Sequence, residues 1–321
     1  MSRPVGFSLT GGLALLDAAV APGTLHNYRR AVHAFLRWLS TRGVGLNDLS
    51  SISSLDSILT LYLHDLYSTG GGKQAGKNAV FGVIHYLPFA RGKLHYSLRS
   101  LRGWERSAPS VPHPPMSFSA LVVIAVSLAG ERRIAMAVGA LVAFDCFLRV
   151  SELTALLKED VAIPNDARLG TAVTANTVSL RLAKTKRGKN QFVSVASRSI
   201  KELFLAYLQS VPSGARVFPF SSASFRLHLK RVCSSLGLPR YVPHSLRHGG
   251  ATFSHLQGLS VEDVMLRGRW ESVKSARHYI QSGRALLLTN DIPSSIASLS
   301  SRLSADLVTA VLKASSLAAQ Q

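Results

Sequence analysis

Cysteines, acidic residues and long hydrophobic runs are all scarce in this 321-residue chain. The two cysteines, Cys146 and Cys233, lie in apolar segments, so we expect buried, reduced thiols rather than a disulfide or a metal site. The longest uncharged apolar run, Met116 to Gly130, is too short to span a bilayer. No Asn-x-Ser/Thr glycosylation acceptor occurs. These absences disfavour a secreted, disulfide-rich or membrane protein.

The N-terminus imitates part of a signal peptide, with Arg3, an apolar run to Leu16 and small residues up to Ala21. Its basic part is a single arginine, and nothing downstream is typical of an extracellular protein. We therefore expect an intracellular protein.

The scarcity of acidic residues leaves a strongly basic chain. There are 37 Lys and Arg against 17 Asp and Glu, a formal net charge of +20. Between Asp166 and Glu262 the only acid is Glu202, whereas fourteen Lys and Arg fall in the same interval. Such an imbalance indicates a polyanionic partner, with nucleic acid ahead of an anionic membrane surface.

Proline marks the predicted domain boundary. The stretch Ser107 to Pro115, SAPSVPHPP, fits neither a helix nor a sheet, because proline lacks the backbone donor that both require. We predict a helical domain over 1–106, a Pro-rich linker over 107–116, a second domain over 117–290 and a C-terminal helical tail over 291–321.

Hydrophobic periodicity predicts four helices before the linker: one capped by Thr24 and closed by Gly43, then 55–67, 74–87 and 94–104. Beyond the linker, Ser117 is the predicted cap of a helix over 120–129, and further helices span 132–147, 199–209 and 222–236. Alternating residues over 177–182 and 191–195 predict a β-hairpin with a basic tip at 183–190. The expected fold class is mainly α, with a small β-sheet in an α+β domain that follows an all-α domain.

The candidate site begins with His244 and Arg247, which lie three residues apart after the helix-starting Pro243 and can reach one phosphate together. Trp270 and Tyr279 follow as an indole donor and a phenol. A phenol is a usable nucleophile only if its developing charge is stabilised. Each residue alone is more often structural.

A second candidate group lies upstream, where an apolar segment delivers Arg149 and, three residues later, Glu152. A lone buried arginine is costly, so Arg149 must be paired or point into a polar cleft. A structural Arg149–Glu152 ion pair is the simpler interpretation of these two residues alone.

In this order, the residues resemble the tyrosine recombinases, also called phage-type integrases. The resemblance covers Pro112 to Leu288 in four boxes: Leu148 to Leu153, the lysine-bearing hairpin, His244 to His248, and Gly268-Arg269-Trp270 followed by Tyr279. The segment Thr24 to Arg42 is similar to the family's core-binding domain, which has a SAM-like fold. The HSLRHGGAT and GRW motifs are also similar to those of recombinases of eukaryotic DIRS and Crypton elements.

The resemblance implies that Tyr279 attacks a DNA phosphodiester, giving a 3′-phosphotyrosyl link and a free 5′-hydroxyl. Arg149 and Arg247 would hold the phosphorane oxygens, and His244 would orient or accept a proton. Trp270, where many members have His, would donate a hydrogen bond to the phosphate.

Lys184 is the implied general acid for the leaving oxygen, with Lys186 as the runner-up. Glu152 would support the active-site cations, and His248 would have a supporting structural role. The set requires no metal, ATP or other cofactor, and the spacing of His244 and His248 lacks a third zinc ligand.

The implied partner is double-stranded DNA, bound by a homo-oligomer, a tetramer in its assembled form. We expect the protein with DNA, in the nucleus if eukaryotic and in the cytoplasm or nucleoid if bacterial. The apolar stripe of the tail, from Ile296 to Leu312, is expected to dock on a neighbouring subunit. The basic residues predicted to contact DNA are Arg29, Arg30, Lys186, Arg187, Lys189, Lys230 and Arg231.

Three alternatives stay open at the level of the sequence. The first is a domesticated, catalytically silent transposon product that only binds DNA. The second is a relaxing enzyme similar to type IB topoisomerases, and the third is a basic RNA-binding or structural protein.

Overall fold

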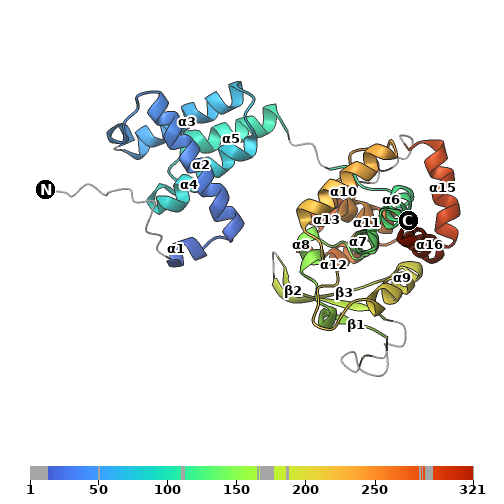
Figure 1. Ribbon diagram of the computed structural model, residues 1–321. Coiled ribbons are helices and arrows are strands. Elements are labelled where there is room, and N and C mark those ends of the chain that lie inside the picture. The colour runs from blue at the N-terminus through green and yellow to red at the C-terminus, as the bar shows by residue number, and fades with distance from the viewer. Residues whose placement is uncertain are drawn as a thin grey trace. The chain divides into compact units, whose positions relative to one another are not determined.

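The computed structural model describes residues 14–49, 51–109, 113–164, 166, 177–185, 188–281, 283, 285 and 292–320. The chain divides into two compact units, Met1–Val111 and Pro112–Gln321 (Figure 1). Each unit has its own buried core.

The first unit is entirely helical in its described residues. Its elements are α1 (Ala14–Ala18), α2 (Pro22–Thr41), η1 (Leu46–Leu49), α3 (Ile52–Ser68), α4 (Lys73–Tyr86), η2 (Pro88–Ala90) and α5 (His95–Ser107). Thr24 does not cap α2: the cap position is Ala21, which makes no side-chain hydrogen bond, because Pro22 starts the helix three residues earlier than predicted. Gly43 follows α2 with φ of 67°, a conformation that glycine adopts without strain.

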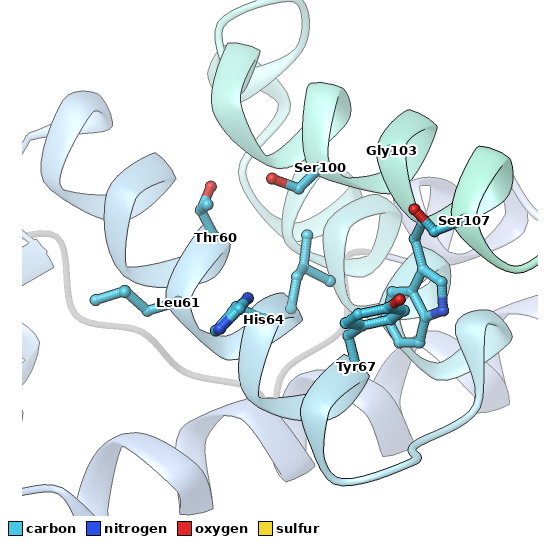
Figure 2. A pocket seen from close by; sticks show the side chains of 9 residues that line it. Thr60, Leu61, His64, Tyr67, Ser100, Gly103 and Ser107 are labelled. Carbon is cyan, nitrogen blue, oxygen red and sulfur yellow. The ribbon is translucent and has the colours of Figure 1, made fainter.

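A groove of about 370 Å³ lies between α3 and α5 of this unit (Figure 2). Its lining is mainly apolar and includes Leu61, Tyr67 and Trp104, together with His64. None of the predicted site residues lines it.

The second unit surrounds two helices that are hydrophobic on all sides, α6 (Phe118–Gly130) and α7 (Ile134–Asp145). Ser117 caps α6 as predicted, since its hydroxyl accepts from the Ala120 N–H. The other helices in the described part of this unit are α8 (Val150–Ala155), η3 (Lys158–Asp160), α9 (Arg198–Gln209), α10 (Ser222–Ser235), α11 (Pro243–Leu256), α12 (Val261–Gly268), α13 (Val273–Tyr279), α15 (Ser294–Ala305) and α16 (Leu307–Gln320).

Three strands of the described residues form one antiparallel sheet in the order β1 (Val161–Ala162), β2 (Ser179–Thr185) and β3 (Gly188–Ser194). In the hairpin, Leu182 pairs with Gln191 and Lys184 pairs with Lys189. The strands therefore extend further toward the tip than predicted. The fold class is confirmed: mainly α with a small antiparallel sheet.

The C-terminal tail corrects an expectation from the sequence. Its stripe, including Ile296, Leu307 and Val311, is buried in the core of its own unit, and α15 and α16 pack on α6 (Figure 1). Leu312, expected in the stripe, is 41% exposed, because it lies one position, about 100°, round α16 from the buried Val311. The stripe needs no neighbouring subunit to cover it.

Within the residues that the structure describes, every helix is too short or too polar to cross a membrane.

Candidate active site

Helix α11 carries three of the predicted site residues, His244, Arg247 and His248, on one face. Two glycines that follow let this helix lie close to its neighbours. A Cβ at Gly249 would stand 2.1 Å from the carbonyl oxygen of Met116, and one at Gly250 would stand 2.0 Å from that of Phe144. The lack of side chains at Gly249 and Gly250 thus sets how closely α11 packs on its neighbours, and with it the position of the site residues.

Arg247 is completely buried. Its Nη1 donates to the Phe147 carbonyl, and its Nη2 donates to the Gly268 carbonyl at 2.7 Å, while its Nε has no hydrogen-bond partner among the described residues. The guanidinium carbon lies 4.7 Å from the Trp270 ring centre and 5.2 Å from that of Tyr279. Burial, followed by the charge of Arg149, lowers the pKa of Arg247 to about 10, so the group stays charged at pH 7.

Tyr279, the last residue of α13, lies against the side chains of α11. Its ring stacks on His248 and on Trp270, with ring centres 4.6 Å apart in both pairs, and meets His244 edge-on at 5.4 Å. The Thr252 hydroxyl donates to the Tyr279 carbonyl at 3.2 Å. The phenol therefore belongs to the same site as Arg247.

Both histidines of this group are neutral at pH 7. Burial, followed by the charge of Arg247, lowers the pKa of His244 to about 4. Burial also lowers the pKa of His248 to about 3, and Gln281 Nε2 lies 3.0 Å from the His248 Nδ1. A neutral His244 beside the Tyr279 ring is able to accept a proton.

Arg149 precedes α8, and Glu152 lies in its first turn. Glu152 Oε1 accepts from Arg149 Nη1 at 2.6 Å, and Oε2 accepts from the Arg149 backbone N–H at 2.9 Å. The Glu152 side chain is 2% exposed and that of Arg149 is 21% exposed. The structural ion pair that the sequence suggested is thus present, and Arg149 still reaches the surface.

The sequence reasoning missed Arg269, which is a second cation on the same carboxylate. Its Nη2 lies 3.0 Å from Glu152 Oε2, and its side chain is 7% exposed. Burial lowers the pKa of Arg269, and the charge of Glu152 opposes this effect. The sequence signal that could have identified Arg269 is its position within the Gly268-Arg269-Trp270 motif.

Trp270 stacks on Phe147 as well as on Tyr279, with ring centres 6.2 Å apart in the Phe147 pair. A Cβ at Gly268 would lie 1.9 Å from the Trp270 ring, so only glycine leaves room for the indole. The buried Trp270 Nε1 has no hydrogen-bond partner within the described part of the chain. It is a donor available for a ligand.

The predicted DNA contacts fall in several places. Lys184 and Lys189 are paired residues of β2 and β3, while Lys186 and Arg187 lie outside the described residues. Lys230 and Arg231 are exposed on α10.

Arg29 and Arg30 are exposed on α2 of the first unit. Arg29 donates to Asp17 at 2.7 Å, which compensates part of its charge. The hydrogen bonds and ion pairs of the described residues leave Arg30 without an acidic partner.

Two further features near the site were not predicted. The Asp145 carboxylate accepts from Arg267 at 3.0 Å and from the Ala196 N–H at 2.8 Å, so it ties α7 to α12 and to the start of α9. His113 of the Pro-rich stretch meets His244 edge-on, with ring centres 6.2 Å apart. Neither contact was predictable from the sequence, because the residues that each contact joins are far apart along the chain.

In the described residues, no group of three or more His, Cys, Asp or Glu side chains is arranged to hold a metal ion.

No model of a known protein family matches the sequence, and a search of curated proteins finds no match. Solved structures do match. A lambda integrase dimer bound to a COC′ core site is 16% identical, with a TM-score of 0.60 over 84% of this chain and 75% of that chain.

XerH site-specific recombinase bound to palindromic difH substrate is 15% identical, with a TM-score of 0.58 over 82% of this chain and 77% of that chain. The Tn1549 transposon integrase in complex with circular intermediate DNA is 12% identical, with a TM-score of 0.52 over 72% and 84%. At these identities the likeness concerns the fold: this chain has the fold of the tyrosine recombinases.

Proposed function

We propose that the protein is a tyrosine recombinase that cuts and rejoins DNA through a covalent 3′-phosphotyrosyl intermediate. The observation that carries this proposal is the assembly around Tyr279, whose ring contacts His244, His248, Trp270 and Arg247 in one chain. Arg247 and Tyr279 are 32 positions apart in sequence, and Arg149 is farther still. A purely structural aromatic cluster would not require a fully buried arginine such as Arg247 against its rings.

In the proposed cleavage step, the Tyr279 Oη attacks the phosphorus while its proton passes to the neutral His244. The bond between phosphorus and the 5′-oxygen breaks, and Lys184 supplies the proton for this leaving oxygen. The covalent link conserves the energy of the phosphodiester, so the reverse attack by a 5′-hydroxyl rejoins the strand.

The charge on the phosphorane is stabilised by Arg149, Arg247 and the free Nε1–H of Trp270. Arg247 is fully buried beneath the rings of Trp270 and Tyr279. Binding of the phosphate therefore requires the Tyr279 ring to move away from this guanidinium.

Double-stranded DNA is the proposed substrate. The net charge of +20 supports it, as does the fold shared with structures solved in complex with DNA. The first unit is the proposed core-binding domain, with α2 supplying Arg30. Assembly as a tetramer on DNA, and kinship with DIRS and Crypton elements through the Gly268-Arg269-Trp270 wording, belong to the same proposal.

The test uses a library of nicked duplexes with randomised sequence around the nick, which traps cleavage because the short strand diffuses away. We expect wild-type protein to form adducts that resist denaturation, and Tyr279→Phe to form none while it still binds DNA. Release of the adduct by nuclease should leave a nucleotide on Tyr279, identified by mass spectrometry.

Persistence of the adduct in Tyr279→Phe would remove this residue as the nucleophile. If wild-type protein binds the duplexes but forms no adduct, the protein is the catalytically silent DNA-binding product instead.

A further inference from the structure

We propose that Arg269 is a positioning residue of the cleavage reaction, which holds Glu152 and thereby aligns Arg149 with the phosphate. This inference rests on the proposed function. It concerns a residue outside the set of proposed catalytic residues.

The backbone at Arg269 is unusual for an arginine. It ends α12 with φ of 57° and ψ of 41°, in the left-handed region that glycine occupies freely. For a residue with a Cβ this conformation is strained. A glycine here would remove the strain, so the fold of this turn does not require the arginine.

The side chain makes contacts that a glycine would lose. Its Nη1 and Nη2 donate to the carbonyls of Cys146 and Phe147, each at 3.3 Å, and Nη2 also donates to Glu152 Oε2 at 3.0 Å. Glu152 thus lies between two guanidiniums, with Arg149 on Oε1 and Arg269 on Oε2.

The charges of this group explain why a second arginine matters. One carboxylate against two guanidiniums leaves a net charge of +1, whereas Glu152 and Arg149 alone would sum to zero. Only Arg149 is partly exposed, so the surplus charge acts where this residue reaches the surface. Arg269 therefore both fixes the carboxylate and preserves the electrostatic strength of Arg149.

Arg269 also shares an acceptor with Arg247. Both donate to the Phe147 carbonyl, and Phe147 itself has a left-handed φ of 49°. Arg269 is consequently connected to both proposed phosphate-binding arginines, through Glu152 to Arg149 and through this carbonyl to Arg247.

The experiment compares Arg269→Gly, Arg269→Met and Arg269→Lys in single-turnover cleavage of the nicked duplex at saturating protein. A misplacement of about 1 Å costs roughly 100-fold in rate, which is the loss we expect for the Gly and Met variants, with DNA affinity unchanged. Arg269→Lys keeps one charge on Glu152 and should recover part of the rate. Arg198→Met is the control, because this arginine forms an exposed ion pair with Glu202 on α9.

Added guanidinium ion separates positioning from folding. Arg269→Gly leaves a space of the shape of the missing group, so guanidinium should restore cleavage, whereas Arg269→Met fills that space and should not respond. In a double-mutant cycle, Arg269→Gly should cost much less in a Glu152→Gln background, because the two residues act together.

Cleavage by Arg269→Gly at the wild-type rate would overturn the inference, as would full additivity with Glu152→Gln. A loss of rate that follows a loss of thermal stability and ignores guanidinium would also overturn it, leaving Arg269 a structural residue. Absence of any wild-type adduct would instead contradict the proposed function.

Discussion

At the scale of single residues, the site depends on which groups are charged. Arg247 keeps its charge under full burial because it has backbone carbonyls as acceptors, whereas His244 and His248 give up their protons. A neutral imidazole beside a phenol and a permanent cation beside the same ring are the two states that the proposed attack of Tyr279 on a phosphate would use.

The neutral histidines predict a dependence of stability on pH. Unfolded histidine has a pKa near 6.5, whereas the folded values are about 4 for His244 and about 3 for His248. Between these values the unfolded chain binds more protons, so stability is fully present above about pH 6.5 and falls as the pH drops toward 4. We expect a loss on the order of 1–3 kcal/mol between pH 7 and pH 5.

Urea unfolding at successive pH values measures this loss. His248→Asn should be less stable at pH 7 yet show a shallower decline on acidification, since one titrating group has been removed. Equal slopes for both proteins would show that His248 is not held neutral by the fold.

At the scale of elements, α11 is positioned by its glycines as much as by its apolar residues. Gly250 faces the Phe144 carbonyl, a backbone atom that cannot rotate away, whereas Gly103 in α5 has nothing within 4 Å of its missing Cβ. Gly250 in α11 and Gly103 in α5 therefore allow a matched comparison, because both are helical but only Gly250 has a close neighbour.

Gly250→Ala should destabilise the second unit by about 3 kcal/mol or more, because overpacking here displaces the backbone of α7. Gly103→Ala should stabilise the first unit by about 0.5–1 kcal/mol, since alanine loses less entropy in a helix. Chemical denaturation of both variants checks the pair. A neutral effect of Gly250→Ala would mean that α11 is free to shift.

The sequence predicted the elements better than their contacts. The apolar helices around Ala120 and Ala137 and the alternating hairpin strands carry periodicities that local residues alone reveal. The left-handed turn at Arg269 and the glycine contacts of α11 depend on residues more than a hundred positions away. The Arg149–Glu152 ion pair was predictable because the two residues are three positions apart. Arg269, which also contacts Glu152, was not, because it lies far away in the sequence.

At the scale of the whole chain, the C-terminal helices belong to the core of the second unit. Leu307 is 2% exposed, whereas Leu317 on the same helix is 51% exposed. Arg132 Nε additionally donates to the Ala318 carbonyl, so the far end of α16 is also fastened. The sequence could not distinguish a stripe covered by its own chain from one covered by a neighbour, because both need the same apolar spacing.

Leu307→Ala should therefore destabilise the isolated protein by about 2–5 kcal/mol through the cavity it leaves, and Leu317→Ala should have little effect. Thermal unfolding of the DNA-free protein provides the comparison. If Leu307→Ala unfolds like wild type but changes the stoichiometry of complexes with DNA, α16 docks on a neighbouring subunit after all.

The Phe147 carbonyl, which accepts from both Arg247 and Arg269, also constrains how the protein can evolve. A rotation of this one peptide group would misalign two guanidiniums at once, so neither can be adjusted without the other. If the proposed function holds, substitutions that change the DNA target would be tolerated best on surfaces remote from this peptide. Arg247, Arg269 and the Phe147 peptide group would then be retained together.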